Sequence, residues 1–162
     1  MATPTANVAP VPDSRVTVAG RRLEVQDLPG TPDRAPIVLL HEGLGSVSLW
    51  REFPTALQRA TGRRTVAFSR FGHGRSEPSP WPTDHLGFHH REARDTLPEM
   101  LSALGLEAPL LLGHSDGASI ALIHAAQHAV AGVVAIAPHV FVEPITLAGI
   151  RATQARYGSE LR

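Results

Sequence analysis

The amino-acid sequence predicts an α/β fold in which helices cover both faces of a mostly parallel sheet. Short apolar runs alternate with segments of helical spacing between residues 37 and 137. Runs that lack polar–apolar alternation are typical of strands buried on both faces, as they are in parallel sheets. Three of the runs end in glycine-rich loops, at residues 41–46, 70–76 and 113–117. Because function gathers beyond the carboxyl ends of such strands, these loops are expected to form the site.

Length and composition indicate one globular domain. The chain has 162 residues, of which 43% are hydrophobic and 19% are charged, so disorder throughout is not expected. The charges of its 15 basic and 15 acidic residues cancel, and a formal net charge of zero argues against a nucleic-acid partner. The absence of cysteine excludes a disulfide scaffold, a thiolate zinc site and a cysteine nucleophile. No apolar run approaches the ~18 residues of a spanning helix and no secretory signal begins the chain, so we expect no membrane association and a cytoplasmic location.

The first part of the chain predicts an arm, a hairpin and a strand–helix–strand unit. Residues 1–14 combine three prolines with small residues, which indicates a disordered arm. Residues 15–18 and 22–25 alternate polar with apolar side chains, the pattern of a half-buried hairpin. The next elements are strands at 37–40 and 65–69, with a helix between them from about Leu49 to Ala60 and Ser48 as its candidate N-cap.

The rest of the chain predicts two more strands and three helices. A helical pattern runs from 87 to 104, and Pro98 must start, kink or restart it because proline lacks the N–H of a helix interior. The later elements are a strand at 109–112, a helix at 118–128, a strand at 130–137 and an amphipathic helix at 145–157. We therefore expect one core over residues 15–140 and a further helical segment over 141–162.

The strongest functional signal lies between the strand at 109–112 and the helix that follows it. The sequence there reads Gly113-His114-Ser115-Asp116-Gly117. A sharp strand-to-helix turn strains the backbone at its central serine and leaves room only for small residues two positions to either side. The hydroxyl then projects above the sheet at the positive end of a helix, where negative charge is stabilised. The motif predicts that Ser115 is a nucleophile.

Three motifs together make residues 16–137 resemble the amino-terminal part of the α/β-hydrolase-fold family. The loop after the third strand is similar to the family's oxyanion loop, the loop at 70–76 to the turn after the fourth strand, and the loop at 113–117 to the nucleophile elbow after the fifth. The resemblance implies the strand order 1-2-4-3-5-6 with the second strand antiparallel. It also implies that residues 15–140 are a partial hydrolase core, truncated after the sixth strand, and that 141–162 begin the family's cap or lid.

The resemblance also implies the roles of the site residues. Ser115 would attack the carbonyl carbon of a small-molecule ester, thioester, amide or carbon–carbon substrate without a cofactor. The N–H groups of Asp116 and Gly43 would stabilise the oxyanion, and Leu44 is the neighbouring candidate donor. The residues that support the elbow and the loop are Gly113, His114, Gly117, His41, Glu42 and Arg70.

Two acidic residues beside the nucleophile need an explanation. Glu42 stands where the family usually has glycine, and its carboxylate would oppose an oxyanion unless it is paired or points away. Because the strands at 37–40 and 65–69 are expected to be neighbours, we predict an ion pair of Glu42 with Arg70 or Arg75. Asp116 has two interpretations: an acid that stabilises the start of a helix, or an anionic group that favours a cationic substrate.

The family's catalytic acid and histidine follow later strands, outside this sequence. Within it, His139 and Glu143 follow the strand at 130–137, and a makeshift base and acid for Ser115 is the weaker alternative. The isolated chain is then expected to be inactive or weakly active, and a non-catalytic binding protein on the same scaffold is the alternative function. The apolar strand at 130–137 would also leave an open edge, through which the chain could associate with itself.

No cofactor or metal site is predicted. The first two glycine loops lack the third glycine of a dinucleotide-binding motif, and no lysine completes a phosphate-binding loop. His89 and His90 are adjacent and therefore diverge on a helix. His124 and His128 are four residues apart and therefore share a helix face, where surface or packing roles are expected.

Overall fold

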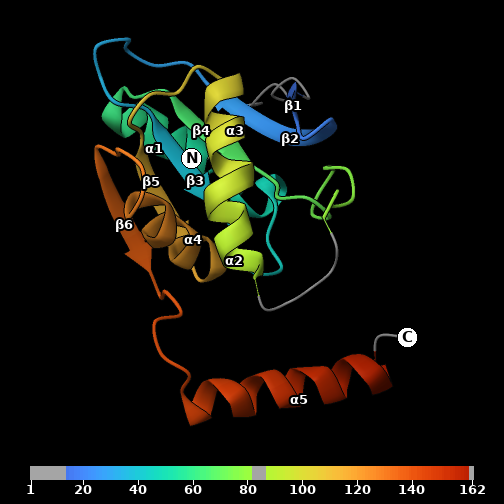
Figure 1. Ribbon diagram of the computed structural model, residues 1–162. Helices are drawn as coiled ribbons and strands as arrows, with labels where there is room; N and C mark the ends of the chain where they lie inside the picture. The colour runs from blue at the N-terminus through green and yellow to red at the C-terminus, as the bar shows by residue number, and fades with distance from the viewer. Residues whose placement is uncertain (1–13, 82–86, 161–162) are drawn as a thin grey trace, which may run out of the picture.

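Residues 14–81 and 87–160 are described by the computed structural model and form a six-stranded sheet with flanking helices (Figure 1). The strand order is β1-β2-β4-β3-β5-β6; the pairs β1–β2 and β2–β4 are antiparallel and the others are parallel. The predicted order and the antiparallel second strand are confirmed. The strands are β1 Ser14–Val18, β2 Arg21–Leu28, β3 Ile37–Leu40, β4 Thr65–Phe68, β5 Leu110–His114 and β6 Gly132–Ile136. Residues 1–13 of the predicted arm lie outside the described residues.

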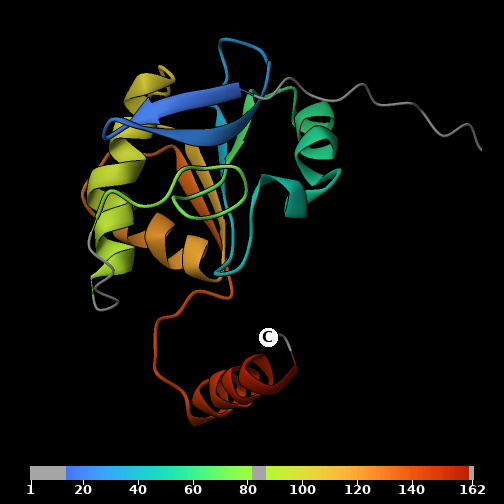
Figure 2. The ribbon, with the colours of Figure 1, turned by 90° about the vertical axis from the view of Figure 1, so that its right-hand side faces the viewer.

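Helices lie on both faces of the sheet, as predicted (Figure 2). The helices of these two layers are α1 Phe53–Thr61, α2 Phe88–Arg91, α3 Leu97–Ala103 and α4 Asp116–Ala125. The last helix, α5 Pro144–Glu160, is not part of either layer (Figure 1). On the α1 side, Leu57 packs with the buried Leu39 of β3. The larger core lies on the other side, where Met100 of α3 and Ile120 of α4 pack with strand residues such as Leu40.

Residues 47–61 form two helical pieces instead of the single predicted helix. A 3₁₀ turn spans Val47–Trp50 and α1 begins at Phe53. Arg51 between them has a φ of 50°, which is incompatible with a continuous right-handed helix. Pro54 lies in the first turn of α1, where its fixed φ suits a helix start. The predicted N-cap at Ser48 is wrong, because Ser48 lies within the 3₁₀ turn.

The helical segment around Pro98 continues through the proline. A π-helical turn, Glu92–Thr96, joins α2 to α3, and Pro98 lies in the first turn of α3. Proline removes one backbone hydrogen bond of a helix and crowds the carbonyl four residues earlier. The wider π turn accommodates both effects, so the predicted kink takes the form of a local change of helical pitch.

The carboxyl ends of β3, β4 and β5 lie side by side. Leu40 at the end of β3 pairs with Phe68 at the end of β4 and with Gly113 of β5. His114 in turn pairs with Ile136 at the end of β6. The glycine-rich loops that follow these strands therefore meet at one edge of the sheet, as the sequence predicts.

Within the described residues, β6 is an edge of the sheet, and its outer surface is partly apolar. The side chains of Val134 and Ile136 are 52% and 46% exposed. Helix α5 lies apart from the sheet (Figure 1). Its apolar residues are not gathered on one face of the helix. The predicted helix at 145–157 is confirmed, but its predicted amphipathic pattern is wrong. Self-association through the β6 edge stays a prediction.

None of the helices within residues 14–81 and 87–160 is long and apolar enough to cross a membrane.

Candidate active site

Ser115 occupies a strained turn between β5 and α4. Its backbone has a φ of 54° and a ψ of −116°. A positive φ of this kind costs a residue with a side chain about 1–3 kcal/mol, unless its surroundings enforce it. The N–H of Ser115 donates to the carbonyl oxygen of Ile136 over 2.8 Å, which ties the turn to the end of β6. The predicted strain at Ser115 is confirmed.

The glycines two residues to either side of Ser115 are required by close packing. A Cβ on Gly113 would overlap the carbonyl oxygen of Gly117 and lie 2.5 Å from the nitrogen of Ala118. A Cβ on Gly117 would overlap the carbonyl oxygen of Leu40. All of these neighbours are backbone atoms, which cannot rotate away as a side chain would. The expectation that only the smallest residues fit at these positions is confirmed.

The loop after β3 passes beside the start of α4. A Cβ on Gly43 would lie 3.0 Å from Oδ2 of Asp116, so the two segments are in tight contact. Among the hydrogen bonds of the described residues, none uses the N–H of Gly43 or that of Asp116. The N–H of Leu44, by contrast, donates to Oε2 of Glu42 over 2.6 Å. Two of the three candidate oxyanion donors therefore have no hydrogen-bond partner within the described residues, whereas the N–H of Leu44 has one.

The predicted ion pair of Glu42 with Arg70 or Arg75 is wrong. The Glu42 carboxylate accepts the N–H of Leu44, a donor only two residues away in its own turn. Arg70 contacts residue 42 through the backbone, because its Nη2 donates to the Glu42 carbonyl oxygen over 3.0 Å. Arg75 pairs instead with Glu24, a buried carboxylate on β2, over 2.9 Å.

Arg70 is a buried cation at the centre of the site. Its side chain is 1% exposed, and its Nη1 donates to the carbonyl oxygen of His41 over 2.9 Å. Its Cζ lies 5.5 Å from the ring centre of Phe88. Burial lowers the pKa of Arg70, while the negative charges of Asp116 and Glu92 act in the opposite direction. Arg70 therefore joins the oxyanion loop to the acidic groups around it.

The carboxylate of Asp116 has three basic side chains around it. Its Oδ1 lies 3.2 Å from Nε2 of His89 and 3.3 Å from Nε2 of His139, and its Oδ2 lies 3.8 Å from Nη2 of Arg70. The hydrogen bond from His89 is the main cause that holds the pKa of the Asp116 carboxyl below its usual value. Asp116 lies in the first turn of α4, as the helix-start interpretation requires. Arg70 is the fixed cation among these neighbours, and it offsets part of the negative charge that a cationic substrate would need.

The segment after β6 brings His139 to the nucleophile. Nε2 of His139 lies 3.0 Å from Oγ of Ser115, and the N–H of His139 donates to Oγ of Ser119 over 2.8 Å. The weaker alternative from the sequence is thus supported for His139 by its position. Glu143 is exposed, and in the described part of the chain no hydrogen bond or ion pair joins its side chain to His139.

His41 holds the oxyanion loop in place as a neutral ring. The N–H of Arg70 donates to Nε2 of His41 over 3.0 Å, so this nitrogen carries no proton. Nδ1 therefore carries it and donates to the carbonyl oxygen of Glu42 over 2.7 Å. Burial, together with the charge of Arg70, lowers the pKa of His41 to about 3. His73 supports the same loop, because its Nε2 lies 2.9 Å from the carbonyl oxygen of Gly43.

Glu92 is a buried carboxyl behind the site. It is 4% exposed, and the hydroxyl of Thr96 donates to its Oε1 over 3.4 Å. Burial raises the pKa of Glu92 to about 7, and the positive charge of Arg70 offsets only part of this effect. Glu92 therefore exchanges its proton near neutral pH.

Replacing Glu92 with glutamine should change how stability depends on pH. In the wild type, the raised pKa means that the folded chain binds the Glu92 proton more tightly than the unfolded chain does. Its contribution to stability is therefore full below about pH 4.5 and lost as the pH rises to about 7. Urea unfolding should show Glu92→Gln gaining about 1–3 kcal/mol on the wild type across this window. A difference that stays constant from pH 4.5 to 8 would contradict the assignment.

Two residues of the site lie outside the sequence-based candidates. The sequence indicates only that the side chains of His89 and His90 point in different directions from one helix. In the structure, the His89 side chain points toward Asp116. Ser119 lies one helical turn after Ser115, which is the signal that could have identified it. The pair of His124 and His128 has the expected packing role, with rings stacked 4.4 Å apart and Nδ1 of His124 bonded to the backbone.

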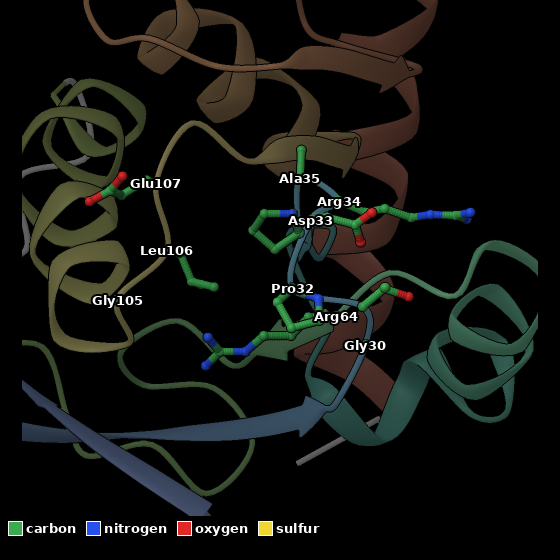
Figure 3. A pocket seen from close by; sticks show the side chains of 11 residues that line it. Gly30, Pro32, Asp33, Arg34, Ala35, Arg64, Gly105, Leu106 and Glu107 are labelled. Carbon is green, nitrogen blue, oxygen red and sulfur yellow. The ribbon is translucent and has the colours of Figure 1, made fainter.

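A pocket of about 440 Å³ lies at the amino ends of β3 and β4, away from Ser115 (Figure 3). Its cations are already bonded within the protein: Arg64 pairs with Asp27 over 2.6 Å, and Arg34 donates to the carbonyl oxygen of Thr61 over 2.7 Å. The pocket is separate from the candidate active site, because none of the residues that line it belongs to the three glycine-rich loops. Its lining residues are Gly30, Thr31, Pro32, Asp33, Arg34, Ala35, Pro36, Arg64, Gly105, Leu106 and Glu107.

Known proteins resemble this chain in fold or in sequence. A diacylglycerol lipase of Danio rerio, sn-1-specific diacylglycerol lipase ABHD11, is 29% identical over 110 residues, which cover 68% of this chain and 33% of that protein. A carboxylesterase structure from Nitrososphaera gargenis has a TM-score of 0.73 at 20% identity and covers 91% of this chain and 54% of its own. Naproxen esterase from Bacillus subtilis has a TM-score of 0.72 at 20% identity, with 91% and 50% covered.

This chain thus spans one third to about half the length of these relatives. The two solved structures are distant in sequence and establish the fold alone. The sequence model of the alpha/beta hydrolase fold matches residues 35–155, which include all three glycine-rich loops. On this match, which covers most of the chain, the protein belongs to the α/β-hydrolase-fold family.

Proposed function

We propose that this chain supplies the nucleophile and the oxyanion site of a serine hydrolase that acts on small carboxylic esters. The observation that carries the proposal is the positive φ of Ser115, enforced by the contacts of Gly113 and Gly117. Strained backbone of this kind persists only where its surroundings hold it, and it gathers at functional sites. A serine needed only for packing would gain nothing from such a conformation.

The chemistry follows from what surrounds the hydroxyl. Oγ of Ser115 would attack the ester carbonyl carbon, and the electrons of the C=O double bond would move onto its oxygen. The open N–H groups of Asp116 and Gly43 are the proposed donors to that oxygen. Each donor of this kind lowers a barrier by about 3–4 kcal/mol. The positive end of α4 stabilises the same developing charge.

Esters are the substrate class that the relatives favour. A carboxylesterase and a naproxen esterase are similar to this chain in fold. A diacylglycerol lipase is similar to it in sequence. On this basis we propose esters ahead of thioesters, amides and carbon–carbon bonds. A non-catalytic binding protein on the same scaffold is the alternative that the following experiment decides.

Covalent labelling with a fluorophosphonate probe tests the nucleophile. Such probes bond phosphorus to an activated serine oxygen and release fluoride, so the wild-type chain should gain the mass of one probe less that of hydrogen fluoride. Ser115→Ala should gain none, because no other serine lies on the elbow. Ser102→Ala serves as the matched control, since Ser102 is an exposed serine on α3, and it should label at the wild-type rate.

Circular dichroism should show that all three proteins are folded before labelling. Failure of the folded wild-type chain to label would contradict the proposal and support the non-catalytic alternative. Labelling of Ser115→Ala at the wild-type rate would also contradict it, since the reactive group would then be elsewhere.

A further inference from the structure

We infer that His73 and Glu42 are positioning residues that hold the oxyanion loop in the orientation the proposed reaction needs. They bind opposite ends of one peptide group, the central peptide that joins Gly43 to Leu44. This inference rests on the proposed function, because the orientation affects a reaction only if Gly43 donates to an oxyanion. It assigns a role to two side chains that take no part in the attack itself.

The loop after β3 contains a β-turn whose ends are fixed. The N–H of Gly45 donates to the carbonyl oxygen of Glu42 over 3.0 Å, which closes a turn over residues 42–45. The same oxygen accepts from Nδ1 of His41 over 2.7 Å and from Nη2 of Arg70 over 3.0 Å. At the other end of the turn, a Cβ on Gly45 would lie 2.8 Å from Cβ of His41, so a larger residue does not fit. Both ends of the turn are therefore held by their surroundings.

The central peptide lies in the middle of this turn, and the hydrogen bond that closes the turn does not bind it. Its carbonyl oxygen, that of Gly43, accepts from Nε2 of His73 over 2.9 Å. Its N–H, that of Leu44, donates to Oε2 of Glu42 over 2.6 Å. Because Gly43 permits a wide range of backbone angles, the peptide could rotate if either bond were lost. The two side chains thus fix the two polar ends of the central peptide.

His73 can bind the Gly43 oxygen whether or not its ring is charged. A carbonyl oxygen only accepts hydrogen bonds, so the contact requires a proton on Nε2. Nδ1 lies 3.1 Å from the carbonyl oxygen of Phe71, which is the longer of the two contacts. A neutral ring with its proton on Nε2 keeps the bond to Gly43, and a second proton on Nδ1 would add a bond to Phe71. The bond that orients the loop is therefore present in both charge states.

This arrangement determines which N–H of the turn is free for an oxyanion. Of the N–H groups of Gly43, Leu44 and Gly45, only that of Gly43 has no partner within residues 14–81 and 87–160. Rotation of the central peptide would bring its carbonyl oxygen toward the side that its N–H now occupies. An oxygen with partial negative charge would then lie within one residue of the proposed donor, where it opposes an oxyanion. His73 and Glu42 prevent this rotation.

The same role explains the carboxylate at residue 42, where the α/β-hydrolase family usually has glycine. A glycine at this position would have no side chain to accept the N–H of Leu44. The buried guanidinium of Arg70 bonds to the backbone oxygen of Glu42 and places a positive charge on the same loop. Glu42 thus acts on the central peptide beside a fixed cation.

Hydrogen exchange of the Leu44 amide, followed by NMR on the isotope-labelled chain, tests the hold on the central peptide. His73→Asn should raise this exchange rate by about threefold to tenfold, the change that loss of one hydrogen bond allows, although His73 binds the other end of the peptide. His73→Gln should keep the rate near that of the wild type, because the longer glutamine can place an N–H at the position of Nε2.

Glu42 is tested by the same measurement. Glu42→Ala should raise the exchange rate of Leu44, since the acceptor of its N–H is removed. Glu42→Gln should keep the rate near that of the wild type, because its amide oxygen accepts the same hydrogen bond without the charge. Equal exchange rates for these two variants would overturn the role of Glu42.

The rate of fluorophosphonate labelling tests the consequence for the reaction. His73→Asn should label about threefold to tenfold more slowly than the wild type, and His73→Gln should recover most of the rate. His90→Asn is the matched control, because His90 is an exposed histidine on α2, and it should label at the wild-type rate. Thermal unfolding should show that all the variants are folded. A general loss of packing would slow both His73 variants alike, so their difference isolates the bond to Gly43.

The outcomes separate this inference from the proposed function. Unchanged Leu44 exchange in the folded His73→Asn variant would overturn the hold of His73 on the central peptide. Equal labelling rates for His73→Asn and His73→Gln would overturn its role in the reaction. Failure of the folded wild type to label would overturn the proposed function, and the exchange rate of Leu44 would still decide whether His73 holds the peptide.

Discussion

Replacing Gly117 with alanine should leave little folded protein. A Cβ at this position would overlap the carbonyl oxygen of Leu40 and lie 2.7 Å from that of His41. Leu40 ends β3, an interior strand of the sheet, and His41 follows it directly, so these oxygens cannot move far without disturbing strand pairing. We expect the free energy of unfolding to fall by more than about 4 kcal/mol, a large share of the ~5–15 kcal/mol that stabilises a domain.

A loss of stability in Gly117→Ala is informative, because helix propensity alone predicts a gain in stability. Alanine is favoured over glycine inside a helix by about 1 kcal/mol. Gly149→Ala in α5 is the matched control, since a Cβ there has no neighbour within 4 Å, and it should keep or raise the helix content. Urea unfolding followed by circular dichroism measures both variants. A Gly117→Ala protein as stable as the wild type would contradict the close packing of α4 against β3.

Replacing Arg70 with methionine should destabilise the chain by about 3–5 kcal/mol, the range for removing one partner of a buried charge network. Methionine keeps much of the volume but cannot donate to the carbonyl oxygens of His41 and Glu42. It would also leave the carboxylate of Asp116 without its buried cation. The loop that carries Gly43 would lose these two hydrogen bonds, so we expect slower fluorophosphonate labelling as well.

Arg22→Met is the matched control for Arg70→Met. Arg22 also pairs with a carboxylate, that of Glu77 over 3.0 Å, but its side chain is 58% exposed. Solvent screens an exposed pair, so its removal should change the free energy of unfolding much less. Equal losses in the two variants would show that burial of Arg70 does not control its contribution.

The sheet could be predicted from the sequence because its signals are local. Buried parallel strands such as 37–40 and 65–69 leave uninterrupted apolar runs, and the glycine-rich loops mark where they end. The elbow is equally local, since the strain at Ser115 and the contacts of Gly113 and Gly117 arise within a few residues of one turn. The strand order came from the resemblance of three motifs to a known family and not from the apolar runs themselves.

The contacts between loops could not be predicted because they depend on where side chains point. The predicted pairing of Glu42 with an arginine failed, since a backbone N–H two residues away is the nearer donor. The role of His89 depends on the rotation of α2 about its axis, which residue spacing does not specify. The break at Arg51 likewise depends on a single positive φ in a residue that ordinarily favours helices.

The most direct test of the central claim is a crystal structure of the wild-type chain after reaction with a fluorophosphonate. The account predicts that phosphorus is bonded to Oγ of Ser115. It also predicts that the phosphonyl oxygen lies about 2.7–3.1 Å from the N–H nitrogens of both Gly43 and Asp116, the distance expected in an oxyanion site. An adduct on another side chain, or a phosphonyl oxygen directed away from both N–H groups, would contradict it.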